Sequence, residues 1–270
     1  MIVTACLVWW NESPSDLEAC VRGIATVADR LVAVDGSYSR YPGATVRSAV
    51  EQEEVIRDTA SQLGLDHSVV VPDRLWAGQV EKRAYALARA SEGSDWVAVV
   101  DADWRISGDR EKVRDELEHF LRRSIWTVAV EFHTPLPDPL AEGWNPEVAS
   151  AWHTLVAGTT VDMAHIFRAL PELTCEGRHW VYSAKPYGKK VWMWGKLDRT
   201  HQRIMQKRLE SPYRIDHMTL HRTPEQVMAS RAFLNDRIWV LEQTGQEDDL
   251  PELRRPIWDY ETVPYTRGQP

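Results

Sequence analysis

Short apolar runs alternate with amphipathic stretches along residues 1–132 of the chain. Continuous, β-branched runs are typical of buried strands, and apolar residues repeated at helical spacing are typical of helices. The predicted strands are 2–8, 30–34, 68–71, 96–100 and 125–132. One predicted helix begins after the capping pair Ser13-Pro14, and others cover 46–63, 79–90 and 109–122. This alternation predicts the α/β class, with a mostly parallel sheet flanked by helices.

The pattern loosens after residue 132. A proline-containing loop at 134–139 leads to shorter predicted strands over 153–168, 174–183, 191–194 and 213–218, and then to a helix over 223–243. This part is a mixture of β and α structure, and no internal repeat or long linker separates it from the first part. We therefore expect one domain built from an α/β half at 1–132 and a mixed half at 133–244, followed by a tail at 245–270.

Composition limits the cellular compartment and the class of protein that we expect. The chain of 270 residues carries 32 Lys and Arg against 40 Asp and Glu, a net charge of −8. Cys6, Cys20 and Cys175 are far apart and form no disulfide framework, which favours a reducing compartment and predicts a cytoplasmic protein. No apolar run approaches the roughly 18 residues of a membrane span, and the apolar start of the chain lacks the basic leader of a signal peptide.

Two carboxylates, Asp101 and Asp103, follow the predicted strand 96–100 with Ala102 between them. Carboxylate oxygens bind hard divalent ions, and a nucleotide diphosphate can complete the shell. Asp-X-Asp alone is a weak signal, but polar residues also follow the first two predicted strands, at Asn11-Glu12 and Asp35-Gly36-Ser37. In an open parallel sheet such strand ends share one edge, where ligands bind. Taken singly, each group also fits ordinary turn and capping chemistry.

The segment Gln79-Val80-Glu81-Lys82-Arg83 opens the predicted helix 79–90. The first turn of a helix attracts phosphate through its free amide groups, and Lys82 and Arg83 add cationic donors. A solvated helix face is the alternative interpretation of the same residues.

Taken in order, these motifs resemble the family 2 glycosyltransferases, which have the Rossmann-like GT-A fold. The resemblance covers about residues 1–180. Beyond residue 132 it rests on two segments, 166–168 and 175–179. The matching segments are Asn11-Glu12, the Leu17-x-x-Cys20 helix, Val34-Asp35-Gly36-Ser37, Gln79-x-x-Lys82-Arg83, Asp101-Ala102-Asp103, Ile166-Phe167-Arg168 and Cys175-Glu176-Gly177-Arg178-His179.

The resemblance implies a nucleotide-sugar donor, by analogy a UDP-sugar, bound by the first half of the chain. It implies that Asp35 contacts the base or ribose, that Asp101 faces ribose or metal, and that Asp103 holds Mn²⁺ or Mg²⁺ on the diphosphate. A later histidine often completes the metal shell in this fold; His217 is the first candidate and His221 the second. The remaining residues expected near the nucleotide are Asn11, Glu12, Gly36, Gln79, Lys82, Arg83 and Ala102.

Glycosyl transfer places negative charge on the leaving diphosphate, which a divalent ion stabilises. Lys82, Arg83 or Arg168 is expected to assist electrostatically. An inverting enzyme also needs a base for the acceptor proton. Here the chain departs from the family, because Trp180 follows His179 where a carboxylate is usual. Glu176, Asp162 and His179 are the candidate substitutes, and a retaining mechanism without that base stays open.

The segment 178–214 carries ten basic and two acidic residues, interleaved with tryptophan and tyrosine. Cations and flat rings suit a phosphate-bearing acceptor, such as modified DNA, an anionic glycan or a lipid head group. The competing interpretation is a solvated hairpin whose rings pack in the core or stack on an uncharged sugar. A non-catalytic, GT-A-like module that binds nucleotide or carbohydrate is the alternative to an enzyme.

Overall fold

The structure is a computed structural model, and it describes residues 1–39, 43–135, 160–176, 178–194 and 206–218. By contacts the chain divides into two units. The first comprises Met1–Ser39, Thr45–Phe132 and Val161–Asp216, and the fold and site described below lie in it. The proposed boundaries at residues 132 and 244 stay a prediction.

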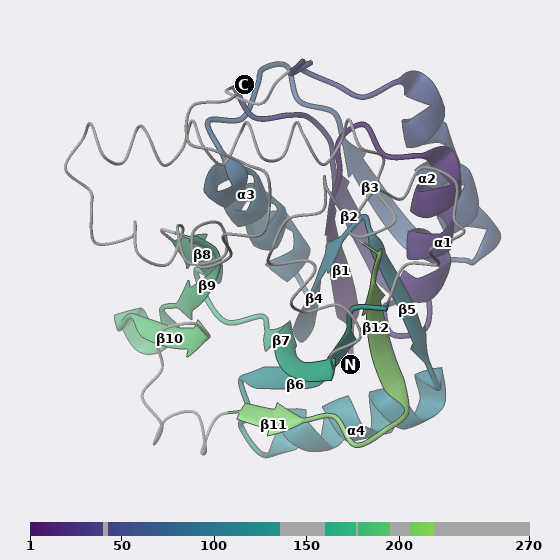
Figure 1. Ribbon diagram of the computed structural model, residues 1–270. Helices are drawn as coiled ribbons and strands as arrows, with labels where there is room; N and C mark the ends of the chain where they lie inside the picture. Colours follow the sequence, from purple (N-terminus) through teal and green to yellow (C-terminus); the bar gives the residue numbers. More distant parts are fainter. Residues whose placement is uncertain (40–42, 136–159, 177, 195–205, 219–270) are drawn as a thin grey trace, which may run out of the picture. The chain divides into compact units, whose positions relative to one another are not determined.

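A large mixed sheet forms the centre of the first unit (Figure 1). Its strand order is β3-β2-β1-β4-β7-β6-β12-β5, and β11 pairs with β6. The first four strands of this order are mutually parallel, whereas β7 runs antiparallel to β4. The strands of the sheet are β1 (Val3–Val8), β2 (Arg30–Val34), β3 (Asp66–Val70), β4 (Trp96–Asp101), β5 (Trp104–Gly108), β6 (Thr127–His133), β7 (Thr160–Arg168), β11 (Gln206–Arg208) and β12 (Tyr213–His217).

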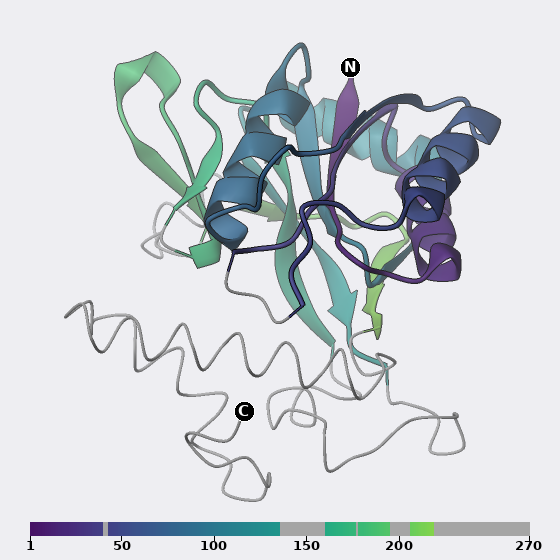
Figure 2. The same cartoon turned by 90° about the horizontal axis from the view of Figure 1, so that it is seen from above.

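Helices cover both faces of the sheet, and Figure 2 shows α1 and α3 on opposite sides of β1. Along β1, Ala5 and Leu7 pack with α1 in one buried cluster, while Cys6 and Val8 pack with α3 in another. Alternate residues of a strand point to opposite faces, so a strand covered on both faces needs an unbroken apolar run. The helices are α1 (Pro14–Ile24), α2 (Val50–Gln62), α3 (Gln79–Ser91) and α4 (Arg110–Arg122).

A smaller antiparallel sheet, in the order β10-β9-β8, packs beside α3. Its strands are β8 (Thr174–Glu176), β9 (Arg178–Ala184) and β10 (Val191–Trp194), and a short 3₁₀ turn, Pro186–Gly188, precedes β10. Tyr182 and Met193 reach the same buried cluster as Leu87 of α3. The small sheet is therefore anchored to the face of the large sheet that α3 covers.

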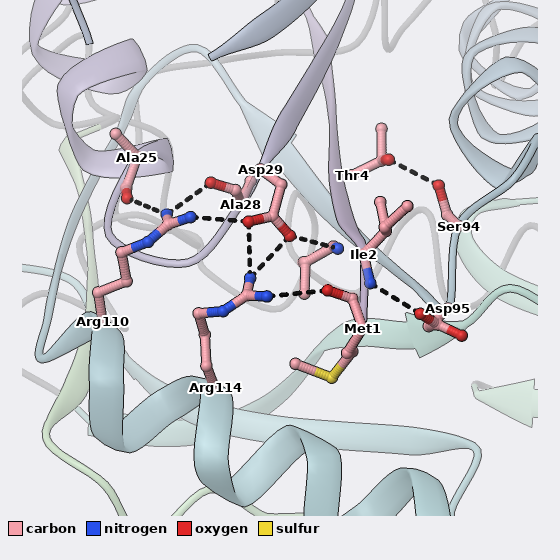
Figure 3. A network of polar contacts seen from close by, with 11 residues as sticks. Met1, Ile2, Thr4, Ala25, Ala28, Asp29, Ser94, Asp95, Arg110 and Arg114 are labelled. Atoms are coloured by element: carbon pink, nitrogen blue, oxygen red, sulfur yellow. Dashed lines mark hydrogen bonds and ion pairs between the residues drawn. The ribbon is translucent and has the colours of Figure 1, made fainter. Parts of the chain in front are cut away.

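Asp29 ties together the amino end of the large sheet (Figure 3). Its carboxylate accepts a hydrogen bond from the Val3 amide at 2.9 Å and ion-pairs with Arg110 at 2.8 Å and Arg114 at 2.7 Å. The two arginines thereby fasten α4 to the start of β1. Their remaining nitrogens donate to the carbonyl oxygens of Ala25, Ala28 and Met1.

The predicted α/β class, with a mostly parallel sheet between helices, is confirmed, and the GT-A type stays a prediction. The five strands predicted in the first 132 residues are present, with shifted ends, but β5 was not predicted. The predicted strand 174–183 is two strands, β8 and β9. The predicted helix 223–243 lies outside the described residues. Among the described helices, none is long and apolar enough to cross a membrane.

Candidate functional site

The strand order reverses direction at β1 and β4. The chain passes from β1 through α1 to β2 on one side, and it returns through α3 to β4 on the other side. The carboxyl ends of the two strands are neighbours, because Val8 lies opposite Asp101. In open α/β sheets such a reversal leaves a crevice beyond the strand ends, where ligands bind. The edge formed by the ends of β1, β2 and β4 is therefore the candidate site.

Asp101 is half-buried at this edge, whereas Lys82 and Arg83 are buried. Its carboxylate ion-pairs with a guanidinium nitrogen of Arg83, and its side chain is 33% exposed against 7% for Arg83. Ala102 is buried in the core, which anchors the turn that follows. Asp103 is largely buried. The structure thus brings together Arg83 and the Asp-X-Asp turn, as the sequence predicts, but it uses Arg83 to hold Asp101 in place.

The donor set fits a divalent ion that a ligand helps to coordinate. Within the described ranges, no group of three His, Cys, Asp or Glu side chains is arranged to hold a metal alone. Mg²⁺ is usually bound by one or two carboxylates together with substrate phosphates, so Asp101 and Asp103 suffice if a diphosphate is present. His217 is the last residue of β12, directly after the end of the first unit at Asp216, and His221 lies outside the described residues. A metal shell completed by a histidine stays a prediction.

Lys82 lies inside the fold, although its sequence position suggested a cation facing the nucleotide. Its side chain is 2% exposed, and its amine donates hydrogen bonds to the carbonyl oxygens of Trp9 and Gly36, each at 2.6 Å. Burial lowers the pKa of Lys82 to about 7. The amine is therefore engaged by the backbone at the ends of β1 and β2.

Asp35 is also buried, and its carboxylate holds a neighbouring loop. One oxygen accepts the Ser48 amide at 2.7 Å, and the other accepts the Ser48 hydroxyl at 2.6 Å. The same hydroxyl accepts the amide of Asn11 at 3.0 Å, which links the loop after β1 to the turn after β2. The indole nitrogen of Trp76 donates to the Asp35 carbonyl oxygen at 2.8 Å. Asp35 therefore acts on protein groups in this structure; a contact with base or ribose stays a prediction.

Gly36 occupies a position that admits no side chain. Its φ of +99° lies in the region that favours glycine, and a Cβ would approach Pro72 and the Val46 carbonyl oxygen to 2.7 Å. Three segments of the chain converge on this turn, which fixes the rim of the candidate site.

The amino end of α3 carries its own carboxylate. Glu81 accepts the amide of Ala77 at 2.6 Å and ion-pairs with Arg74 at 2.5 Å. The Arg74 hydrogen bond holds the pKa of Glu81 below its usual value. Gln79 is the first residue of this helix, and Glu12 donates its amide to Gln52 at 3.2 Å on the far side of the edge. A phosphate at the start of α3 would have to compete with the Glu81 carboxylate for the Ala77 amide and for Arg74.

Arg168 requires a correction. β7 runs antiparallel to β4, and Arg168 lies opposite Trp96, at the amino end of β4. Five residues of strand separate that point from Asp101, about 16 Å. Arg168 donates to the Leu121 carbonyl oxygen at 3.3 Å. It therefore lies at the amino end of β4, away from the candidate site, and the expectation that it assists the leaving group is wrong.

The three candidate bases lie on three different strands. Glu176 ends β8, and its carboxylate accepts hydrogen bonds from Lys190 and Ser183, which lower its pKa. Asp162 ion-pairs with Arg208 at 3.1 Å. His179 lies in β9, but its side chain is outside the described part of the chain. Glu176 belongs to the small sheet beside the start of α3, since the Cys175 thiol donates to the Val80 carbonyl oxygen at 3.3 Å.

A hollow of about 850 Å³ lies elsewhere, among β5, β6, β11 and β12. Its lining is mixed in charge, and its arginines are already paired: Arg208 with Asp162, and Arg214 with Asp216 at 2.7 Å. None of the predicted site residues lines it. We place the candidate site at the strand ends because the reversal of strand order and the Asp-X-Asp turn coincide there.

Ser48 and Trp76 were not predicted as site residues from the sequence. Ser48 lies in a polar loop 13 residues after Asp35, and no local pattern marks it. Trp76 carried a usable signal, because it is a large aromatic residue in the loop between β3 and α3. It is 5% exposed and packs against Tyr85 of α3 with ring centres 5.3 Å apart.

No family model matches the sequence, and no curated protein does. Among solved structures the chain is similar to TarS of S. aureus, at 14% identity and a TM-score of 0.39, over 66% of this chain and 32% of TarS. It is similar to a mycobacterial protein at 13% identity and a TM-score of 0.43, over 90% and 75% of the two chains. A CMP:2-keto-3-deoxy-manno-octonic acid synthetase complexed with CTP has 7% identity and a TM-score of 0.33, over 63% and 75%. The chain spans about a third of TarS, and such likenesses leave the activity to be argued from its own residues.

Proposed function

We propose that the protein transfers a sugar from a nucleotide-sugar donor, by analogy UDP-linked, to a hydroxyl group of an acceptor. One observation carries the proposal. The Asp101-Ala102-Asp103 turn ends β4 at the point where the strand order reverses, beside the end of β1. That is the place where an α/β sheet binds nucleotides, and a pair of carboxylates there suits a divalent ion on a diphosphate.

Each residue at this edge then has a definite task. Asp101 and Asp103 would hold Mn²⁺ or Mg²⁺, which when bound stabilises negative charge on the leaving diphosphate. Arg83 keeps the Asp101 carboxylate in a fixed orientation through their ion pair. The turn around Gly36 and the loop at Asn11 form the rim against which the nucleoside would lie.

The base of an inverting reaction would be Glu176 or His179. Glu176 is the better defined of the two, but Lys190 and Ser183 lower its pKa and so its basicity. A shift of its partners on acceptor binding would be needed before it accepts a proton. A retaining reaction needs no such base, and the product anomer, measured by NMR, distinguishes the two.

The acceptor that we propose is polyanionic, with modified DNA, an anionic glycan and a lipid head group as the candidates. The turn between β9 and β10 offers Lys185, Lys189 and Lys190, and Lys190 also stacks on Trp192, 4.4 Å from the ring centre. Lys185 and Lys190 are paired with Glu172 and Glu176. A phosphate-rich acceptor would compete for these lysines, so its affinity should fall steeply with added salt. A salt-independent affinity would point to a neutral acceptor.

Thermal unfolding with a panel of nucleoside diphosphates and nucleotide sugars, each with and without Mn²⁺, tests the donor site. A true donor at 100 times its dissociation constant adds about 2.7 kcal/mol to the free energy of unfolding. We expect one nucleotide to give this shift only when the metal is present. The absence of a metal-dependent shift for every nucleotide would falsify the proposal.

A non-catalytic nucleotide- or carbohydrate-binding module is the second candidate. The observation that favours it is the engagement of Glu176, one of the candidate bases, by Lys190 and Ser183. Both candidates predict the thermal shift, but only an enzyme hydrolyses or transfers the donor. Release of UDP from a UDP-sugar, with and without acceptor, therefore separates them.

A further inference from the structure

The amine of Lys82 joins two strand ends that no longer pair through the sheet. The ladder between β1 and β2 ends with Val8 opposite Val34, followed by a hydrogen bond from the Trp9 amide to the Val34 carbonyl oxygen at 3.2 Å. Beyond that point, Lys82 donates to the carbonyl oxygens of Trp9 and Gly36, both at 2.6 Å. A side chain of α3 thus continues the connection after the backbone ladder has stopped.

Each of the two loops that start here is part of the candidate site. Asn11 follows Trp9 by two residues, and Asp35 and Ser37 flank Gly36. Because buried carbonyl groups require donors, loss of the amine would leave both strand ends under-satisfied and free to separate. The distance between the two loops is therefore set by the buried Lys82 nitrogen together with the Ser48 hydroxyl, which links Asp35 to the Asn11 amide.

The surroundings of the amine suit a neutral or a charged group. Asp35, Asp101 and Glu12 favour the charged form, while burial and the guanidinium of Arg83 oppose it. The ring of Tyr38 lies 5.8 Å from the nitrogen. An ammonium group has three N–H donors and a neutral amine has two, so both forms can serve two carbonyl oxygens.

We propose that Lys82 is a positioning residue of the candidate nucleotide site: it fixes the spacing between the loop after β1 and the turn after β2, and it does not touch the nucleotide. That the two loops bind a nucleotide rests on the proposed function. The clamp, by which we mean the two hydrogen bonds from Lys82 to Trp9 and Gly36, does not. The proposed role also separates Lys82 from Arg83, its neighbour on α3, which contacts Asp101 directly.

The first test is the pH profile of UDP binding in the presence of Mg²⁺, measured by calorimetry on the wild-type chain from about pH 7 to about pH 8.5. Over this range the phosphates of UDP keep their charge, since the second pKa of a phosphate is about 6, and the uracil N3–H stays largely protonated, whereas Lys82 becomes neutral. A positioning amine predicts an affinity that changes less than threefold. A drop of tenfold or more would mean that Lys82 binds phosphate as a cation, and the inference would be overturned.

The second test needs no ligand. Lys82→Met removes both donors and keeps an unbranched side chain, and Arg89→Met on the exposed face of α3 is the matched control. We expect amide hydrogen exchange in peptides covering 9–12 and 35–39 to be at least tenfold faster in Lys82→Met, with the interior of β4 unchanged and the control like wild type. Unchanged exchange in these peptides would overturn the clamp.

The two failures are distinguishable. If the wild-type chain binds no nucleotide but Lys82→Met loosens the two loops, the proposed function fails and the clamp stands. If UDP binds and Lys82→Met neither loosens the loops nor weakens UDP binding by about tenfold, the clamp fails and the proposed function stands.

Discussion

Replacing Asp29 with alanine should destabilise the protein more than any surface charge change. The carboxylate serves the Val3 amide, Arg110 and Arg114 at once (Figure 3). It is only 28% exposed, and Arg114 is 26% exposed, so solvent replaces these contacts poorly. Hydrogen bonds to charged groups contribute about 1.5–3 kcal/mol each when buried, and about half of that at this exposure. With about 1 kcal/mol for Val3, the loss sums to roughly 3 kcal/mol.

Urea unfolding at pH 7 measures this loss. For a chain of this size a 3 kcal/mol change moves the midpoint by about 1 M, taking a slope near 3 kcal/mol per molar. Asp29→Asn keeps an acceptor for the Val3 amide and should lose about half as much. Glu18→Ala, which breaks the exposed pair with Arg22 at 2.8 Å, is the control and should cost about 0.3–0.5 kcal/mol. If Asp29→Ala falls within 0.5 kcal/mol of that control, the network does not fasten α4 to the sheet.

Three further predictions concern the site. Burial lowers the pKa of Lys82 in the folded chain to about 7, so between pH 7 and pH 9 the folded chain loses a proton that the unfolded chain keeps. The free energy of unfolding of wild type, measured in urea, should therefore rise by about 2 kcal/mol relative to that of Lys82→Met over this range. A difference that does not change with pH contradicts this. Asp103→Asn should abolish the metal-dependent thermal shift with UDP, whereas Asp58→Asn, an exposed change on α2, should retain it; a retained shift in Asp103→Asn removes its metal role. Gly36→Ala should cost at least 2 kcal/mol by urea unfolding, since its Cβ meets atoms at 2.7 Å, whereas Gly64→Ala, also at positive φ but with nothing within 4 Å, should cost about 1 kcal/mol; equal costs would refute the packing argument.

The elements of the first half were predictable because hydrophobic periodicity reports burial directly. The runs that became β1 and β4 are almost entirely apolar, with Thr4 as the exception in β1 and Asp101 as the polar end of β4, and both faces of those strands are covered. β5 was missed because only two residues separate it from β4, although Trp104 and Ile106 alternate with polar residues as a half-buried strand requires. The residues after β4 were interpreted as a loop, although a new strand begins there after a gap of two residues.

Strand direction was the second limit. Arg168 ends a strand, as predicted, but the periodicity of residues 160–168 is the same for a parallel and an antiparallel strand. Pairing with β4 decides the direction, and that pairing joins Trp96 to Arg168 across 72 positions of sequence. Arg168 was expected at the wrong end of β4 because the direction of its own strand could not be determined from the sequence.

Charged side chains at the strand ends were the third limit. Lys82 and Asp35 were recognised as special, but their partners are Trp9, Gly36 and Ser48, groups brought close only by the fold. The separation of 73 residues between Lys82 and Trp9 leaves no local pattern. Sequence position can indicate that a charge lies at a site edge, but only packing shows whether it faces a ligand or the scaffold.

The distribution of exposure at the edge leads to a prediction about metal dependence. Asp35, Lys82 and Arg83 are all buried and engaged within the protein, whereas Asp101 is 33% exposed. An approaching diphosphate would therefore meet a carboxylate first and be repelled, unless a cation lies between them. We expect that excess EDTA abolishes the thermal shift given by UDP and that Mg²⁺ or Mn²⁺ restores it. A shift that persists in EDTA would mean that the nucleotide avoids Asp101 altogether, and its site would then have to be sought away from the end of β4.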